Sequence, residues 1–106
     1  MDDLLALFKA LSDETRLRMV VLLAEHEHCV CELTEILNLS QPKASRHLAK
    51  LKELGVVKTR RESQFIYYSL AINRDVTRDV IHTLKNHVPH NNTLREDAKR
   101  APRCAL

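Results

Sequence analysis

Two cysteines separated by one residue, Cys29 and Cys31, are the side chains of this 106-residue chain that are best suited to chemistry. A thiolate is a soft ligand and selects soft, thiophilic centres. On a regular α-helix, residues at this spacing project about 200° apart, so both sulfurs reach one ion only if the backbone is irregular there or distorts on binding. A ligand that needs both sulfurs therefore pulls on the backbone that carries them.

A second group of side chains, between residues 40 and 61, has the chemistry of a nucleic-acid contact. Residues 41–62 carry seven basic and two acidic side chains, whereas residues 1–40 carry three basic and eight acidic ones. Basic groups near phosphates release counterions, and amide, hydroxyl, imidazole and guanidinium groups can contact base edges in a major groove. The residues that we expect to contact DNA are Ser40, Gln41, Lys43, Ser45, Arg46, His47, Lys50, Arg60 and Arg61.

The apolar pattern of this region predicts two helices joined by a tight turn. The first begins near Val30, and the second is capped by Ser40, carries Pro42 in its first turn and stops at Gly55, the only glycine. Composition alone fits a solvated charged face equally well. A second helix that is apolar on one face and basic on the other instead describes a helix-turn-helix.

Further elements surround this pair of helices. We expect one helix to start near Leu4 and another to be capped by Ser12 or Asp13, and Val56–Arg60 and Phe65–Leu70 read as two strands. A hairpin directly after a helix-turn-helix is a wing. The sequence thus predicts a mainly α protein with a small β-hairpin, a winged helix-turn-helix of about five helices and one two-stranded wing.

A last predicted helix, from about Asn73 to Val88, carries an apolar residue at every fourth position. Such a narrow seam favours pairing with a second copy of the chain over packing on the domain's own core. We expect a homodimer whose interface includes Leu4, Leu5, Phe8, Val76, Val80, Leu84 and Val88. Residues 91–106 are polar and lack periodicity, so we expect a domain over 1–90 followed by a flexible tail over 91–106.

Four blocks of sequence carry a family resemblance: Leu11–Leu17 (LSDETRL), Ser40–Leu48 (SQPKASRHL), Gly55–Val57 (GVV) and the pair Tyr67-Tyr68. In this order, over about residues 3–90, they resemble the ArsR/SmtB family of bacterial metal-sensing repressors. Cys29–Leu33 (CVCEL) looks like the thiol signature of its arsenite-responsive branch. The resemblance implies a dimeric repressor of an arsenic-resistance operon. It would bind double-stranded operator DNA with an inverted repeat and leave it when a thiophilic ion binds.

The inducer that the resemblance implies is trivalent arsenic or antimony, with no constitutive cofactor, and these centres prefer three sulfur ligands. The third cysteine of the family pattern would fall at position 34, which is Thr34 here. Cys104 is the remaining thiol, and an extended segment 91–104 spans about 45 Å, enough to reach the pair in either subunit. Alternatively, a small thiol or water completes the shell, or the ligand is a methylated arsenical. The candidate ligands are Cys29, Cys31 and Cys104.

Three other functions stay open for the thiols and histidines. The first is a redox or sulfur-species sensor of the same fold, in which Cys29 or Cys31 reacts with an oxidant or with Cys104. The second is a small thiol oxidoreductase, which usually needs a Cys-x-x-Cys spacing, so we do not expect an enzyme. The third is zinc binding by the last helix, whose candidate ligands are Asp79, His82, His87 and His90.

Composition limits the class of protein. A chain of 106 residues that is 44% hydrophobic and 29% charged forms one folded domain. Its longest apolar run, Met19–Ala24, is far shorter than a membrane span, and its first residues do not resemble a secretory signal. We therefore expect no membrane partner, a cytoplasmic location and reduced thiols.

Overall fold

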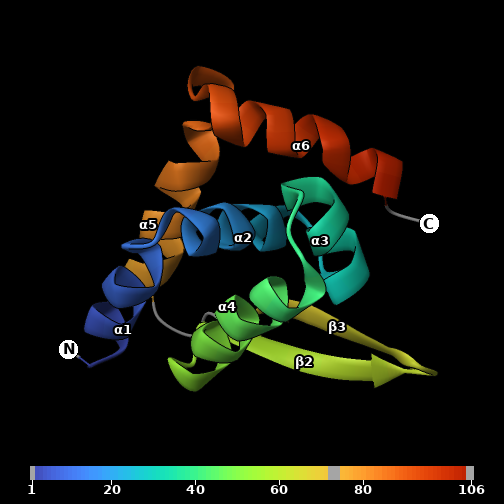
Figure 1. The fold of residues 1–106 in the computed structure, drawn as a ribbon. Coiled ribbons are helices and arrows are strands. Elements are labelled where there is room, and N and C mark those ends of the chain that lie inside the picture. Colours follow the sequence, from blue (N-terminus) through green and yellow to red (C-terminus); the bar gives the residue numbers. More distant parts are fainter. Residues whose placement is uncertain (1, 72–74, 105–106) are drawn as a thin grey trace.

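A computed structural model describes the backbone of residues 2–71 and 75–104, and the side chains of residues 2–71 and 77–101 (Figure 1). The elements, in chain order, are α1 (Asp2–Leu11), α2 (Glu14–Glu25), β1 (His28–Cys29), α3 (Val30–Leu37), α4 (Gln41–Glu53), β2 (Val57–Glu62), β3 (Phe65–Leu70), α5 (Asp75–Asn86), the 3₁₀ turn η1 (Val88–His90) and α6 (Asn92–Cys104). Helix α6 crosses one side of the molecule, and α4 and the hairpin lie on the opposite side (Figure 1).

Local signals at the helix ends act as the sequence predicts. The Asp13 carboxylate accepts a hydrogen bond from the Arg16 N–H at 3.0 Å, which starts α2 and lowers the pKa of Asp13. The Ser40 hydroxyl accepts one from the Lys43 N–H at 3.3 Å, which starts α4. Gly55 has φ +78°, a conformation that favours glycine, and turns the chain from α4 toward β2. The helix-turn-helix is therefore bounded by its own residues.

The core lies between α2, α3 and α4. Met19, Leu33, Ile36, Leu48 and Leu51 are fully buried there. Because Leu48 and Leu51 fill the inner face of α4, its polar residues are left on the outer face. Burial thus fixes which side of α4 is available to a partner.

The sheet differs from the predicted two-stranded wing because it has a third strand. Its order is β1-β3-β2, with both pairings antiparallel. The added strand contains only His28 and Cys29, which face Tyr68 and Tyr67 of β3. Two residues are too few to show an alternating pattern, and their pairing joins positions far apart in sequence. The wing is consequently tied to the segment that holds the cysteines.

Helix α6 corrects the prediction of a flexible tail after residue 90. The buried Asp97 accepts hydrogen bonds from the Arg18 guanidinium at 2.8 and 2.9 Å and from Arg100 Nη2 at 2.8 Å. Arg100 Nε also donates to the Ile36 carbonyl oxygen at 2.7 Å, so α6 is attached to both α2 and α3. The segment lacks an obvious apolar stripe because a buried ion pair, with Leu94, provides much of its attachment.

The remaining helices agree with the pattern at the level of whole elements. Helix α5 covers the predicted last helix from Asp75 onward, and residues 73–74 lie outside the described part of the chain. With α6 there are six α-helices in the described ranges, one more than expected. None of these described helices is both long enough and apolar enough to cross a membrane.

Candidate functional site

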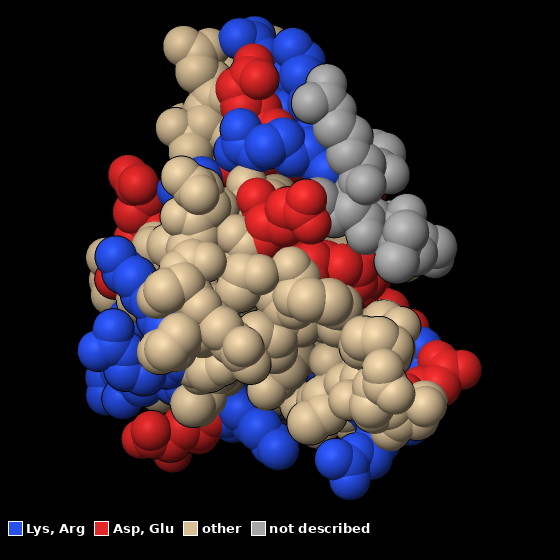
Figure 2. All heavy atoms as spheres, turned by 45° about the vertical axis from the view of Figure 1, so that its right-hand side comes forward, with Lys and Arg blue, Asp and Glu red and all other residues tan. Residues whose placement is uncertain are grey.

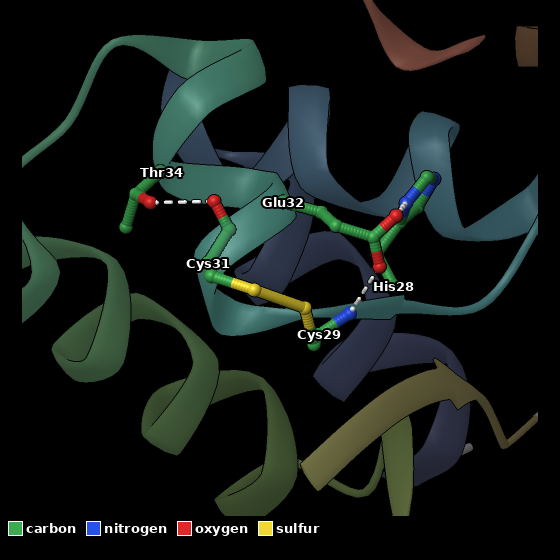
Figure 3. The surroundings of a disulfide bond; sticks show 5 residues. All are labelled: His28, Cys29, Cys31, Glu32 and Thr34. Atoms are coloured by element: carbon green, nitrogen blue, oxygen red, sulfur yellow. Dashed lines mark hydrogen bonds and ion pairs between the residues drawn. A yellow bond between two sulfur atoms is a disulfide. The ribbon is translucent and has the colours of Figure 1, made fainter. Parts of the chain in front are cut away.

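The two cysteines meet at the start of α3. Cys29 is the N-cap residue with extended backbone (φ −83°, ψ 167°), and Cys31 lies in the first turn. Their sulfurs form a disulfide, and their Cα atoms are 5.5 Å apart (Figure 3). Of the two conditions that the spacing left open, the structure shows the irregular helix start: the extended N-cap removes the angular separation that a regular helix imposes. The expectation of two free thiols is wrong for this structure, because the extended N-cap brings the two sulfurs close enough to form a disulfide.

The two sulfurs differ in exposure and in backbone support. Cys29 is 5% exposed, whereas Cys31 is exposed to solvent. The Cys29 N–H donates to Glu32 Oε1 at 3.0 Å (Figure 3). The Glu32 side chain thus caps the first turn of α3, as the glutamate of a capping box does. Cys29 is therefore the anchored sulfur and Cys31 the accessible one.

Thr34 lies beside the pair but its hydroxyl has another role. Its Oγ1 donates to the Cys31 carbonyl oxygen at 2.7 Å (Figure 3). A hydroxyl held by the backbone is a poor ligand for a soft centre. The pair itself therefore offers two sulfur ligands and no third.

His28 lies on the other side of β1, away from the cysteines. It is 1% exposed, and burial lowers its pKa, against the opposing effect of Glu32, whose Oε2 lies 3.5 Å from His28 Nδ1. The ring lines a cavity of about 410 Å³ between α2 and α6, together with Glu25 and His26. Neither cysteine lines this cavity, so it is separate from the thiol pair.

Most of the residues expected to contact DNA lie on the outer face of α4. Exposed side chains there come from Gln41, Lys43, Ser45, Arg46 and Lys50, and Ser40 caps the helix. In Figure 2, lysines and arginines border the left side and lower edge of the molecule around a tan area, and others lie at its top; Figure 1 places α4 and the hairpin in the lower part. This face has the position and charge that a major-groove contact needs.

Three of these residues have carboxylate partners. His47 is partly buried, with Nδ1 3.8 Å from Asp13 Oδ1, and Lys50 Nζ lies 3.7 Å from Glu53 Oε1. Arg60 of β2 donates from Nε to both oxygens of Glu27 at 3.1 Å, whereas its neighbour Arg61 is exposed. The structure therefore brings the α4 residues together but turns Arg60 toward the segment before β1.

The residues expected at a dimer interface form a surface of two adjacent helices. In α1, Leu5 and Phe8 are each 52% exposed and Leu4 is partly exposed. Helix α5 packs against α1 and buries Ile81 in the core, so Val80 and Leu84 stay partly exposed, as does Val88 in η1. The side chain of Val76 lies outside the described residues. An apolar surface is therefore present where the prediction needs one.

Among the described side chains, the histidines are not part of a metal site. Cys104 ends α6, its side chain lies outside the described part, and a helix over 92–104 spans about 20 Å instead of the 45 Å of an extended chain. The rings of His87 and His90 are 6.4 Å apart. No group of three or more His, Cys, Asp or Glu side chains in the described ranges is arranged to hold a metal ion.

The sequence pattern did not predict the roles of two carboxylates near the thiol pair, Glu32 and Glu27. Glu32 stands three residues after the N-cap Cys29, the spacing of a capping box, so this signal was available in the sequence. Glu27 carries no such signal, because its partner Arg60 lies 33 residues away. Both place a carboxylate next to the thiol segment.

The fold and this surface define the class: a winged helix-turn-helix DNA-binding regulator with a thiol pair at the start of α3, the helix that precedes the recognition helix α4. Residues 13–59 match the family described as bacterial regulatory protein, arsR family. A possible ArsR-family transcriptional regulator of Mycobacterium bovis is 31% identical over 86% of both chains, so the chain belongs to the ArsR family. Because this is a family of regulatory proteins, the expectation that the chain is not an enzyme is confirmed.

Two curated relatives and two solved structures illustrate the similarity. The arsenic resistance transcriptional regulator ArsR1 of Pseudomonas putida is 59% identical over 64 residues, 59% of this chain and 50% of that protein. The arsenical resistance operon repressor of Escherichia coli is 52% identical over 66 residues, 61% of this chain and 56% of that protein. The matches thus span about half the length of these relatives.

The structural matches cover most of both chains. HlyU from Vibrio cholerae aligns with a TM-score of 0.72 and 36% identity over 79% of this chain and 89% of its own. A homodimeric winged helix-turn-helix DNA-binding domain of Mycobacterium bovis aligns with a TM-score of 0.67 and 31% identity over 86% of both chains. The expected fold class, a winged helix-turn-helix, is confirmed.

Proposed function

We propose that this chain is a dimeric repressor of an arsenic-resistance operon that leaves its operator when trivalent arsenic or antimony binds the reduced thiols of Cys29 and Cys31. The observation that carries the proposal is the convergence of both sulfurs on one point at the start of α3. The names of the two curated relatives, both tied to arsenic resistance, support the same ligand.

The chemistry at the pair is an exchange of ligands. The two thiols replace two hydroxyl groups of arsenous acid and release two molecules of water, with no change in oxidation state. Two ligands of one centre lie farther apart than two bonded sulfurs, so the first turn of α3 adjusts when the ligand binds. The third position is filled by Cys104 of either subunit, by a small external thiol or by water.

The DNA contacts divide between base edges and phosphates. Gln41, Ser45 and Arg46 lie near the N-terminus of α4, where side chains reach base edges. Lys43, Lys50 and Arg61 are exposed cations suited to phosphates, and Ser40 and His47 flank the same face. A dimer through α1 and α5 presents two such helices to an inverted repeat whose half-sites are about 34 Å apart. The site of action is the cytoplasm, where the operator is.

Ligand binding acts on this face because α3 leads directly into α4. A ligand can weaken DNA binding only by the difference between its affinities for the DNA-free and the DNA-bound conformation of the protein. Full switching needs a differential of about 5.5 kcal/mol, a scale that strong bonds between sulfur and a soft centre can supply. Movement of the α3 N-terminus is the step that converts binding into release.

The test is fluorescence anisotropy of the reduced protein on DNA from upstream of its own gene, titrated with arsenite at fixed salt. We expect arsenite to release the wild-type protein but neither Cys29→Ser nor Cys31→Ser. Cys104→Ser measured in parallel decides whether that thiol is a ligand. Tight DNA binding by wild type that arsenite leaves unchanged overturns the proposed ligand.

The disulfide favours one second candidate, redox sensing. In that reaction the two thiols lose two electrons and two protons to an oxidant such as a peroxide and form the Cys29–Cys31 bond. Mass spectrometry of the released protein separates the two candidates. Arsenite-released protein carries bound arsenic with both cysteines reduced, whereas a redox sensor carries the disulfide.

A further inference from the structure

The segment between α2 and β1 is joined to the wing by one ion pair. Arg60 Nε lies 3.1 Å from both carboxylate oxygens of Glu27, and Arg60 Nη2 donates to the same group. On its other edge, Arg60 Nη1 donates to Glu62 Oε2 at 3.0 Å. All three guanidinium nitrogens thus donate to carboxylates. The two carboxylates offset the positive charge of Arg60 and leave a phosphate only the remaining hydrogens of Nη1 and Nη2.

The same arginine lies in register with the thiol pair. Cys29 on β1 faces Tyr67 on β3, and Tyr67 faces Arg60 on β2, so the three residues form one row across the sheet. The Arg60 guanidinium carbon lies 4.6 Å from the centre of the Tyr67 ring. Residues opposite each other in antiparallel strands project to the same face, which explains why these groups meet.

From this row we infer that Glu27 and Arg60 are positioning residues that couple the thiol pair to the wing, and that Arg60 is not a phosphate contact. The inference rests on the proposed function and specifies how its site is regulated. A displacement of Cys29 by a bound ligand moves its ladder partner Tyr67 and changes the alignment of Glu27 with Arg60. A bidentate pair is sensitive to such a change because both of its hydrogen bonds need one geometry.

The pair is exposed enough for this role to be separated from folding. The side chains of Arg60 and Glu27 are 48% and 31% exposed. Exposed ion pairs contribute little to folding stability, so loss of this one leaves the domain folded. Any effect of its removal on the ligand response is then a coupling effect.

The first arm of the test uses operator affinity with and without saturating arsenite, measured on reduced protein. For coupled sites the ratio of the two affinities is about 5–150-fold. We expect Glu27→Gln and Arg60→Gln to reduce the ratio to about twofold or less, with the arsenite-free affinity little changed. A wild-type ratio in both variants overturns the inference.

Arg61→Gln is the matched control, because Arg61 is the next residue of β2 and is exposed. Each lost phosphate contact lowers the slope of log affinity against log salt by about 0.9, so loss of Arg61 from both subunits of the dimer lowers it by about 1.8. We expect Arg61→Gln to lower the salt slope and to keep the wild-type ratio of operator affinities without and with arsenite. We expect Arg60→Gln to keep the wild-type slope and to lower that ratio. A lowered slope in Arg60→Gln makes that residue a phosphate contact and overturns the inference.

The second arm needs no DNA, which separates this inference from the proposed function. In ¹⁵N-labelled reduced protein, we expect arsenite to shift the Arg60 Nε–H resonance in wild type but not in Cys29→Ser. A shift without any change in operator affinity contradicts the proposed function and supports the coupling. Release from DNA with an unmoved Arg60 resonance supports the proposed function and overturns the coupling.

Discussion

Cys29 and Tyr67 face each other across the ladder between β1 and β3, so the buried sulfur of the thiol pair belongs to the sheet that forms the wing. Cys29 also precedes α3 directly, and α3 leads into α4. Cys29 is therefore linked to the wing by strand pairing and to α4 along the chain through α3. A ligand on this sulfur can bias the recognition helix and the wing together.

The first prediction concerns the missing third thiol. Thr34 lies one helical turn after Cys31, and its side chain reaches back to the Cys31 carbonyl. We expect Thr34→Cys to place a third sulfur beside the pair and to lower the arsenite concentration for half-release from DNA by about tenfold or more. Anisotropy titrations at fixed salt measure this. Thr34→Ser is the control and should behave as wild type; an unchanged midpoint in Thr34→Cys contradicts the expected placement.

The second prediction concerns base recognition. Arg46 is exposed on the outer face of α4, where a guanidinium can contact guanine in the major groove. Arg46→Ala should weaken operator binding by about 1–3 kcal/mol at matched salt while leaving the free energy of unfolding nearly unchanged. Lys99→Ala, an exposed cation of α6, serves as the control and should keep its affinity. Equal affinities of Arg46→Ala and wild type would remove Arg46 from the contact set.

The third prediction concerns the attachment of α6. Asp97 is 1% exposed and accepts hydrogen bonds from both Arg18 and Arg100. Removal of its charge leaves the Arg18 guanidinium without its main partner, so Asp97→Asn should lower the free energy of unfolding by about 3 kcal/mol. Urea denaturation followed by circular dichroism measures the loss. Glu96→Gln, at the exposed neighbouring position, should change it little; similar values for the two variants would mean that the charge of Asp97 contributes little to folding.

The fourth prediction concerns pH. Burial holds the pKa of His28 below its ordinary value of 6.5, with Glu32 acting in the opposite direction and His26 in the same direction. Below pH 6.5 the unfolded chain takes up a proton that the folded chain does not, so stability is full above 6.5 and falls as the pH drops toward the native pKa. The slope from this group reaches about 1.4 kcal/mol per pH unit.

Denaturation curves measured at several pH values between 7.5 and 5.5 test this effect of His28. The quantity compared is the slope of unfolding free energy against pH. His28→Gln should flatten the fall in unfolding free energy, whatever its absolute stability. His82→Gln, which replaces an exposed histidine of α5, should retain the wild-type slope. A wild-type slope in His28→Gln would assign the acid sensitivity to other groups.

The sequence by itself determined the elements whose signals are local. Each of these signals acts within a few residues: Ser40 caps α4, Gly55 turns the chain after α4, and Leu48 and Leu51 form its apolar stripe. Such signals were sufficient to predict the helix-turn-helix and its outward basic face. For the two cysteines the spacing left two possibilities, an irregular helix start or a helix that distorts on binding, and the structure shows the irregular start.

The tertiary structure decided what depends on pairings between distant residues. Arg18 meets Asp97 across 79 residues and holds α6, which the pattern presented as a loose tail. Glu27 meets Arg60 across 33 residues, and Cys29 joins β3 as a third strand. Hydrophobic periodicity does not predict such partners, because each is a single polar group or a two-residue strand. Their positions are fixed only when the core brings the two segments together.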